Sequence, residues 1–217
     1  PFFFCGYFCT HYRHIISLPN PCLQRNEIQE GYLAMKSKSY SKGLRICFAG
    51  KCVISKGIFN VIDTVNLLAD INLLENCTLA GDGEKIELRT RLNHRAAQRT
   101  IIAGALSRCD LNRVYADSHF ILLPSRSEGF PKVLAEAAAF GCIPIVSNLP
   151  GIDKIIQNNV NGVLLEDLHE EKIVERLTTI WYDQKKMKKM ANQVHEWSKQ
   201  FSYDHFVHSI DYLLRKK

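Results

Sequence analysis

The stretch from residue 120 to residue 147 constrains the fold most, because it carries a complete strand, turn, helix and strand in succession. An apolar run (120–123) enters a polar turn, Pro131 opens an Ala-rich helical segment, and Gly141 ends that segment before a second apolar run (143–146). Proline suits the first turn of a helix, and glycine suits the residue after its end. Two short apolar runs joined by one helix favour parallel strands. The stretch therefore predicts a βαβ unit.

The same alternation extends over most of the chain. Apolar runs lie at 44–50, 77–81, 100–104, 119–124, 143–147 and 161–166, and helical patterns lie between them at 58–68, 84–92, 110–115, 131–140 and 153–157. Repeated βα units predict an α/β fold with a Rossmann-like doubly wound parallel sheet. In such sheets ligands bind at the carboxyl ends of the strands, so the loops at that edge are the candidate sites.

The segment after the last apolar run is expected to be helical. Its first apolar stripe consists of Met187, Met190, Val194 and Trp197. A stripe of this kind favours packing over a cofactor site. Ser202 is expected to cap a last helix that turns an apolar face inward, formed by Phe206, Val207, Ile210, Leu213 and Leu214.

The first part of the chain differs in character from the rest. Residues 1–42 contain a Pro-bracketed segment and a Lys- and Ser-rich stretch, so we expect extended chain and a linker there, the remnant of an N-terminal domain. Residues 43–217 are expected to form the Rossmann-like domain. The chain starts at Pro1 without a basic leader, and we expect further sequence upstream. Its apolar runs are far shorter than the roughly 20 residues of a membrane-spanning helix.

Charge and cysteine content narrow the partners and the compartment. The net charge is +6, with a Lys-rich stretch at 185–189, for which a solvated helix face is the simpler interpretation and peripheral contact with an anionic membrane surface is the alternative. No basic run is interleaved with aromatic residues, which disfavours nucleic acid. Several of the eight cysteines fall in apolar runs, as buried free thiols do. We expect a reducing compartment, the cytoplasm or the inner face of the membrane.

Metal sites find little support in the sequence. Cys5, Cys9, His11 and His14 match no compact zinc spacing. No Asp-x-Asp pair is present to hold a divalent metal on a diphosphate. The sequence therefore predicts no metal and no cofactor.

The turn before the Ala-rich helix has the properties of an anion site. Gly129 permits close approach of a ligand, and the N–H groups at the start of the helix carry partial positive charge. Glu128 lies in this turn, and Glu136 lies eight positions later among apolar residues. A carboxylate in such surroundings needs partners. A vicinal diol is one candidate partner for Glu136, and an exposed or salt-bridged position is the alternative.

Two lysines follow the first predicted strand. Lys51 and Lys56 flank the segment CVIS, and Gly57 then leads into a helix. Both ammonium groups can reach a phosphate group at the sheet edge, although paired lysines in a loop are commonly just solvated. The GDG turn at 81–83 lacks the spacing and the acidic residue of a dinucleotide fingerprint.

These motifs together resemble the C-terminal, donor-binding domain of the GT-B fold retaining glycosyltransferases of family 4, the group 1 type. The quoted pieces, in the order of the family, are ISLPNP, FAGKCVISKG, LAGDGE, SEGFPKVLAEAAAFGCIPIVS, NLPGIDKIIQNNVNGVLL and FSYDHF. The fourth resembles the family's turn with two glutamates separated by seven residues, and the second resembles its diphosphate loop. The resemblance covers the chain from about residue 15 to its end.

The resemblance implies a role for each motif. Glu136 would hold the ribose hydroxyls, and Glu128 would contact the donor sugar. Lys51 and Lys56 would bind the diphosphate and stabilise the charge of the leaving group. The other implied binding residues are Gly50, Ala105, Leu106 and Ser107, of which the last three line the base pocket, and Gly129, Phe130, Pro131, Lys132 and Val133.

The implied reaction is metal-independent transfer, with retention, of a sugar from a UDP- or GDP-sugar to an acceptor hydroxyl. The acceptor would be a glycan or a lipid-linked glycan, in polysaccharide or glycoconjugate synthesis. Lys51 stands where the family has Arg. A guanidinium that can bind a phosphate through two donors is thereby replaced by an ammonium that acts as a point charge. The family's N-terminal domain, which carries the acceptor site, is absent or reduced to the first tens of residues here. A non-catalytic nucleotide-sugar-binding module that needs a partner is therefore the main alternative, and a sugar-nucleotide epimerase is a weaker one.

Overall fold

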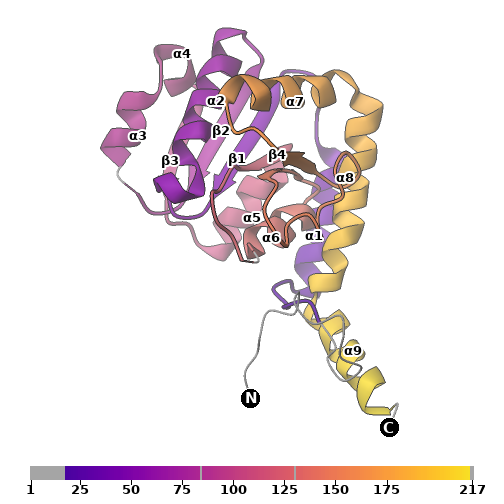
Figure 1. The fold of residues 1–217 in the computed structure, drawn as a ribbon. Coiled ribbons are helices and arrows are strands. Elements are labelled where there is room, and N and C mark those ends of the chain that lie inside the picture. The colour runs from indigo at the N-terminus through magenta and orange to yellow at the C-terminus, as the bar shows by residue number, and fades with distance from the viewer. Residues whose placement is uncertain (1–17, 84, 130, 216–217) are drawn as a thin grey trace.

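The computed structural model describes residues 18–83, 85–129 and 131–215, and they form a six-stranded parallel sheet with helices on both faces (Figure 1). The strand order is β3-β2-β1-β4-β5-β6. The strands are β1 (Leu44–Ala49), β2 (Leu74–Ala80), β3 (Thr100–Gly104), β4 (Phe120–Leu123), β5 (Ile143–Ser147) and β6 (Val163–Leu165). The predicted doubly wound sheet is confirmed. Because the order reverses between β1 and β4, the carboxyl ends of these two strands border a topological switch point.

The helices form two layers. One face is covered by α2 (Ile58–Asp70), α3 (Lys85–Arg91), α4 (His94–Ala97) and α7 (Glu170–Tyr182), and the other by α1 (Arg25–Ser37), α5 (Arg108–Asp117), α6 (Lys132–Ala139) and α8 (Gln184–Ser198). Two short 3-10 turns, η1 (Ile54–Lys56) and η2 (Lys199–Phe201), precede α2 and α9 (Tyr203–Arg215). Among the described helices none is both long and apolar enough to cross a bilayer.

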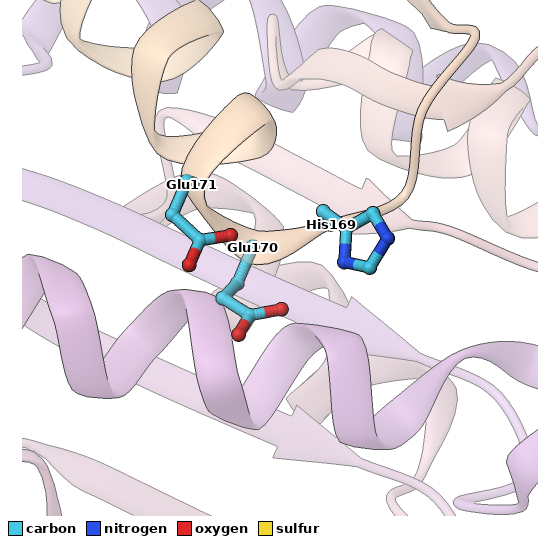
Figure 2. A group of neighbouring side chains, drawn as sticks. All are labelled: His169, Glu170 and Glu171. Carbon is cyan, nitrogen blue, oxygen red and sulfur yellow. The ribbon is translucent and has the colours of Figure 1, made fainter.

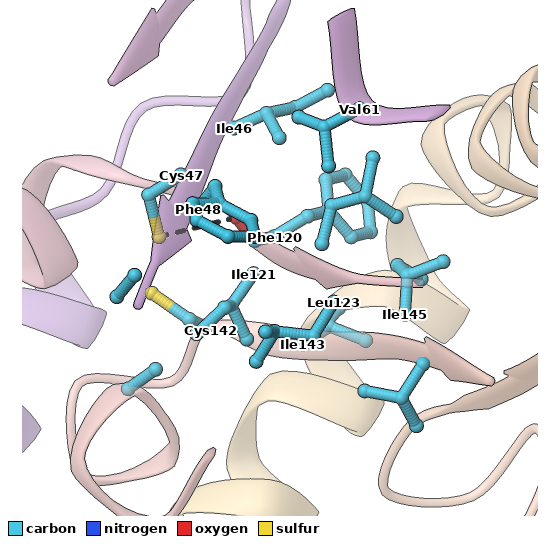
Figure 3. Close-up of a cluster of buried hydrophobic side chains, with 14 of the residues drawn as sticks. Ile46, Cys47, Phe48, Val61, Phe120, Ile121, Leu123, Cys142, Ile143 and Ile145 are labelled. Carbon is cyan, nitrogen blue, oxygen red and sulfur yellow. Dashed lines mark hydrogen bonds between the residues drawn. The ribbon is translucent and has the colours of Figure 1, made fainter. Parts of the chain in front are cut away.

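The core lies along the central strands. Every residue of β4 and β5 is buried, which accounts for their unbroken apolar sequences. Buried side chains lie on both faces of these strands, among them Phe48, Phe120 and Ile145 on one face and Ile121 on the other (Figure 3). At about 25 cal/mol per Å² of apolar surface, burial of this kind supplies most of the folding free energy. It also fixes the strand ends that carry the candidate site.

The expectation of extended linker structure before residue 43 is wrong for the described residues. The segment 25–37 forms α1, which packs on α5, α6 and α8, with Leu23 and Met35 buried. The close approach depends on Gly31, because a Cβ there would overlap the Ala139 carbonyl of α6. The prediction missed this because a glycine contact adds nothing to an apolar pattern. Residues 1–17, with Cys5, Cys9, His11 and His14, lie outside the described part.

Lys38, just after α1, connects this helix to α5 and α6. Its Nζ atom donates to the backbone carbonyls of Tyr115, Ser118 and Phe140, at the ends of α5 and α6. Burial lowers the pKa of Lys38, although the three carbonyl oxygens replace its lost hydration. Residues 25–38 are thus an integral part of the folded unit. The division of function at residue 42 stays a prediction.

The tail differs from expectation in one respect. α8 buries Met187, Met190 and Val194 of its predicted stripe and leaves Trp197 half-buried. By contrast, α9 buries none of its residues, and Val207 and Leu214 remain 64% and 65% exposed. The expected inward face of α9 is therefore wrong, because the helix leaves the body after η2 and projects away from it (Figure 1). One smaller expectation also fails: the segment 153–157 forms a turn and irregular chain instead of a helix.

Candidate functional site at the carboxyl edge of the sheet

Two loops meet at the switch point. The loop after β1 and the turn after β4 are joined by a hydrogen bond from the Arg126 amide to the Ser55 carbonyl at 2.9 Å. Gly57 lets them approach, since it adopts a φ of 72° and a Cβ there would overlap the Pro124 carbonyl. The predicted lysines and Glu128 therefore lie on neighbouring loops.

Lys56 and Glu128 are in contact. Lys56 Nζ lies 2.8 Å from Glu128 Oε1, and the Ser125 hydroxyl donates to the same oxygen at 2.7 Å. The Glu128 side chain is only 10% exposed, whereas that of Lys56 is 33% exposed. The structure thus fixes the orientation of the carboxylate with two donors and leaves part of the Lys56 side chain exposed. Lys51 is exposed, and the residues described give it no carboxylate partner.

The turn before α6 borders open space at Gly129. A Cβ at Gly129 would meet no atom within 4 Å, and Pro131 provides no side-chain cap for the helix. The amides of Lys132 and Val133, in the first turn, are the kind that α-helices leave without intrahelical partners. Phe130 lies outside the described residues. This turn can therefore accept an anion next to Glu128.

Glu136 is buried on α6 and salt-bridged. Arg108 Nη1 pairs with Glu136 Oε1, and the Tyr115 hydroxyl lies 3.4 Å from Oε2. The salt-bridged alternative from the sequence is thus what the structure shows, and it does not use all the acceptor capacity of the carboxylate, which has about four lone-pair positions. Tyr115 is completely buried, and the pKa of its phenol is raised by burial and by the charge of Glu136.

Arg108, Glu27 and Asn112 were not predicted as site residues from the sequence. Arg108 Nε donates to Glu27 Oε1 at 2.6 Å, and Asn112 Nδ2 donates to the same oxygen at 3.0 Å. Burial opposes ionisation of Glu27, but these hydrogen bonds outweigh burial and lower its pKa below the ordinary value. No motif signals this cluster, because its members come from α1 and α5, 81 residues apart in the chain.

The predicted base-pocket residues lead into this cluster. Ala105 and Ser107 are exposed, Leu106 is half-buried, and the Ser107 hydroxyl accepts the Asp110 amide at the start of α5. They follow β3, directly before Arg108. Gly50 follows β1 with a φ of 146°. All described site candidates therefore lie at the carboxyl edge, with Lys56 and Glu128 in one group and Glu136 in a second.

A small cavity and an unpaired hydroxyl lie beside Glu128. The cavity holds about 10 Å³, roughly one water, and Glu128, Pro131 and Ser147 are among its lining residues. Ser147 ends β5, and its buried Oγ has no hydrogen-bond partner within the described structure. A serine at a strand end carries no distinctive pattern, so the sequence did not single it out.

Two other clusters of charged residues, on α7 and α8, belong to neither of these groups. His169, Glu170 and Glu171 bring their ligand atoms within 4.8 Å of one another at the first turn of α7 (Figure 2). Acidic groups at a helix start stabilise the helix without an ion. The Lys-rich stretch of α8 lies at the opposite, amino edge of the sheet: Lys188 sits over the Tyr40 ring, and that ring stacks on His119, just before β4.

Comparison with known proteins gives the same family that the motifs resemble. The family model described as "Glycosyl transferases group 1" matches residues 33–197. An uncharacterized glycosyltransferase of Methanocaldococcus jannaschii is 29% identical over 174 residues, which are 77% of this chain and 46% of that protein. A protein of Escherichia coli named UDP-Gal:alpha-D-GlcNAc-diphosphoundecaprenol alpha-1,3-galactosyltransferase is 26% identical over 67% of this chain and 38% of its own length.

Solved structures show the same fold. The Anabaena protein HepE in complex with UDP superposes with a TM-score of 0.69 at 18% identity, over 90% of this chain and 54% of that one. The chain thus spans about half the length, or less, of the relatives that it matches. Since the family model covers most of the residues, the chain belongs to the group 1 glycosyltransferases, whose GT-B fold has the Rossmann-like half described above.

Proposed function

We propose that this chain is the donor-binding half of a retaining, metal-independent glycosyltransferase. The observation that carries the proposal is the convergence, at the switch point, of Lys56, Glu128 and the uncapped start of α6. A nucleotide diphosphate sugar needs both a cationic and an N–H-rich site for its phosphates and an oriented acceptor for its hydroxyl groups.

In this proposal the diphosphate lies between the loop after β1 and the start of α6. Lys51 and Lys56 neutralise the charge that develops as the nucleoside diphosphate leaves, and the amides of Lys132 and Val133 add to this. Such a donor set needs no divalent metal. Lys56 would contact the phosphates while keeping its ion pair, because an ammonium has three donors.

Glu128 and Glu136 bind the hydroxyl groups at either end of the donor. Glu128, held by Ser125 and Lys56, accepts from the donor sugar. Glu136 accepts from the ribose diol, next to the base segment 105–107. The resemblance of the two-glutamate motif supports the assignment of retention.

The second half of the enzyme is proposed to come from residues beyond this chain. Two observations support this: the partial coverage of the relatives, and the exposed apolar face of α9, which starts at the carboxyl edge. The name of the Escherichia coli relative suggests a lipid-linked glycan acceptor and a UDP-linked donor.

Thermal unfolding with UDP, GDP and their sugar conjugates tests donor binding. The chain should gain stability with at least one of them, by about 2–3 kcal/mol at a hundredfold excess over Kd. Glu136→Ala should remove most of that gain, whereas Glu175→Ala, an exposed and ion-paired control, should not. No shift with any nucleotide would overturn the proposal.

A non-catalytic binding module remains the second candidate, favoured by the short span of the chain relative to its relatives. The two differ in the outcome of a transfer assay on the full-length reading frame. Transfer of labelled sugar supports the enzyme, and tight donor binding without turnover supports the module.

A further inference from the structure

Arg108 is anchored on three sides at the start of α5. Its Nε donates to Glu27 Oε1, its Nη1 pairs with Glu136 Oε1, and its Nη2 donates to the Cys22 carbonyl at 3.2 Å. The planar guanidinium offers these donors in a fixed geometry that a flexible ammonium lacks. Its own pKa is raised, since the charges of Glu27 and Glu136 outweigh the effect of burial. Arg108 therefore connects α1, α5 and α6 through one rigid group.

Glu27 is the fixed end of this connection. It is 6% exposed, its Oε1 accepts from Arg108 and Asn112, and its Oε2 accepts the Gln24 amide at 2.8 Å as part of a capping box at the start of α1. Its orientation is thus set by the backbone of its own helix. A guanidinium held by such a carboxylate has little freedom to swing away from Glu136.

Glu136 has no comparable support of its own. Apart from Arg108, its described hydrogen-bond partner is the Tyr115 hydroxyl at 3.4 Å, a long and weak contact. Without Arg108 the carboxylate would lose its only close partner among the described residues and be free to change rotamer. A carboxylate must be held within a fraction of an ångström to accept two hydrogen bonds from one diol.

We propose that Arg108 is a positioning residue for nucleotide binding: it holds the Glu136 carboxylate in the orientation that accepts the ribose diol, and Glu27 holds Arg108. The inference rests on the proposed function, in which Glu136 binds ribose. It adds that α1, a helix outside the nucleotide loops, contributes to the affinity for the ribose through one guanidinium.

The test compares UDP with 2′,3′-dideoxyuridine diphosphate by titration calorimetry on the 217-residue chain. Two hydrogen bonds to a charged group correspond to a preference for UDP of about 100-fold or more in the unmodified chain. Arg108→Met should reduce this preference to below about threefold, while the Kd for the dideoxy compound changes by less than about twofold. Arg108→Lys keeps the positive charge but not the planar set of donors, and it should give an intermediate preference for UDP.

Arg113→Met is the matched control. Arg113 lies on the same helix and pairs with Asp110, but its side chain is 76% exposed and away from Glu136. It should leave the UDP preference unchanged. Glu27→Gln keeps the shape of the anchor but removes its charge, and should lower the preference even if Arg108→Met fails to fold.

The possible results distinguish a failure of the positioning role of Arg108 from a failure of the ribose-binding role of Glu136. If Glu136→Ala lowers the preference and Arg108→Met and Glu27→Gln do not, the positioning role is overturned and the ribose contact stands. Equal weakening of UDP and the dideoxy compound by Arg108→Met shows direct contact with the nucleotide or a purely structural role, and also overturns it. If the unmodified chain does not prefer UDP, or binds neither compound, both the inference and the ribose-binding role of Glu136 fail.

Discussion

Lys56 Nζ and Glu128 Oε1 are 2.8 Å apart, so the residue proposed to bind phosphate and the residue proposed to bind sugar are paired with each other. The pair joins the loop after β1 to the turn after β4 across the switch point. A donor that binds there would meet a preformed site, in which little side-chain ordering remains to be completed.

Substitutions of Lys56 and Glu128 are expected to affect different ligands. Lys56→Ala should weaken binding of UDP itself by about 10–100-fold, because a charge-assisted contact is worth about 1.5–3 kcal/mol. Glu128→Gln should leave UDP affinity nearly unchanged and reduce only the additional affinity of the UDP-sugar. Calorimetry with both ligands measures the difference, with Lys172→Ala on α7 as the control. An equal loss for UDP and UDP-sugar in Glu128→Gln would contradict the assignment of Glu128 to the sugar.

Gly57→Ala should be strongly destabilising. The new Cβ would overlap the Pro124 carbonyl and would also occupy a left-handed backbone position, which together cost about 2–4 kcal/mol. Gly151→Ala is the matched control, because its φ is also positive, at 94°, but a Cβ there meets nothing within 4 Å. Urea unfolding should show a clearly larger loss for Gly57→Ala. Similar losses for the two variants would show that the contact between the loops is unimportant.

His119 should make stability depend on pH. Burial lowers the pKa of His119 to about 3, and its Nδ1 accepts the Arg45 amide, so the folded protein holds the neutral ring. The unfolded chain binds a proton near pH 6.5, and the free energy of unfolding should therefore fall as the pH drops below that value and go on falling towards pH 3. Between pH 7 and pH 5 the loss should be about 1–2 kcal/mol.

Chemical denaturation at several pH values measures this loss, and His119→Asn should show a shallower pH dependence than the unmodified chain. The asparagine oxygen can still accept the Arg45 amide but does not titrate. Parallel pH profiles for the two proteins would rule out His119 as the cause.

Deletion of residues 203–217 should leave the domain as stable as before. No described residue of α9 is buried, so the unfolding temperature should change by less than about 2 °C. The deletion should also reduce self-association at high concentration, since α9 exposes Val207, Ile210 and Leu214. Light scattering and thermal unfolding measure the two effects. A fall of more than about 5 °C would show that α9 packs on the domain in solution.

Much of the fold was predictable because burial on both faces of a parallel sheet leaves an unmistakable pattern. The run from Phe120 to Leu123 and the helix that ends before Gly141 follow that pattern directly. Glu128 and Lys56 could be assigned to one sheet edge by the same reasoning, because both follow strands. Their mutual contact depends on the backbone approach at Gly57, which a periodicity does not encode.

Other parts were not predictable, for different physical reasons. α1 packs through Gly31 and a buried ammonium at Lys38, and neither adds to an apolar stripe. Arg108 is indistinguishable in sequence from a solvated arginine, because its partners come from distant segments. The apolar face of α9 was predicted correctly. An amphipathic pattern indicates that one face of a helix packs against another surface, but it does not show which surface that is.

The position of α1 has a practical consequence for exchanging domains between relatives. Because Glu27 and Lys38 lie before residue 43, a hybrid enzyme joined at that boundary would take a foreign residue next to Arg108 and a foreign group beneath α5 and α6. A junction placed ahead of Cys22 would carry the whole network across intact. The recombination point that conserves the nucleotide site therefore lies upstream of the first strand by more than the length of a helix.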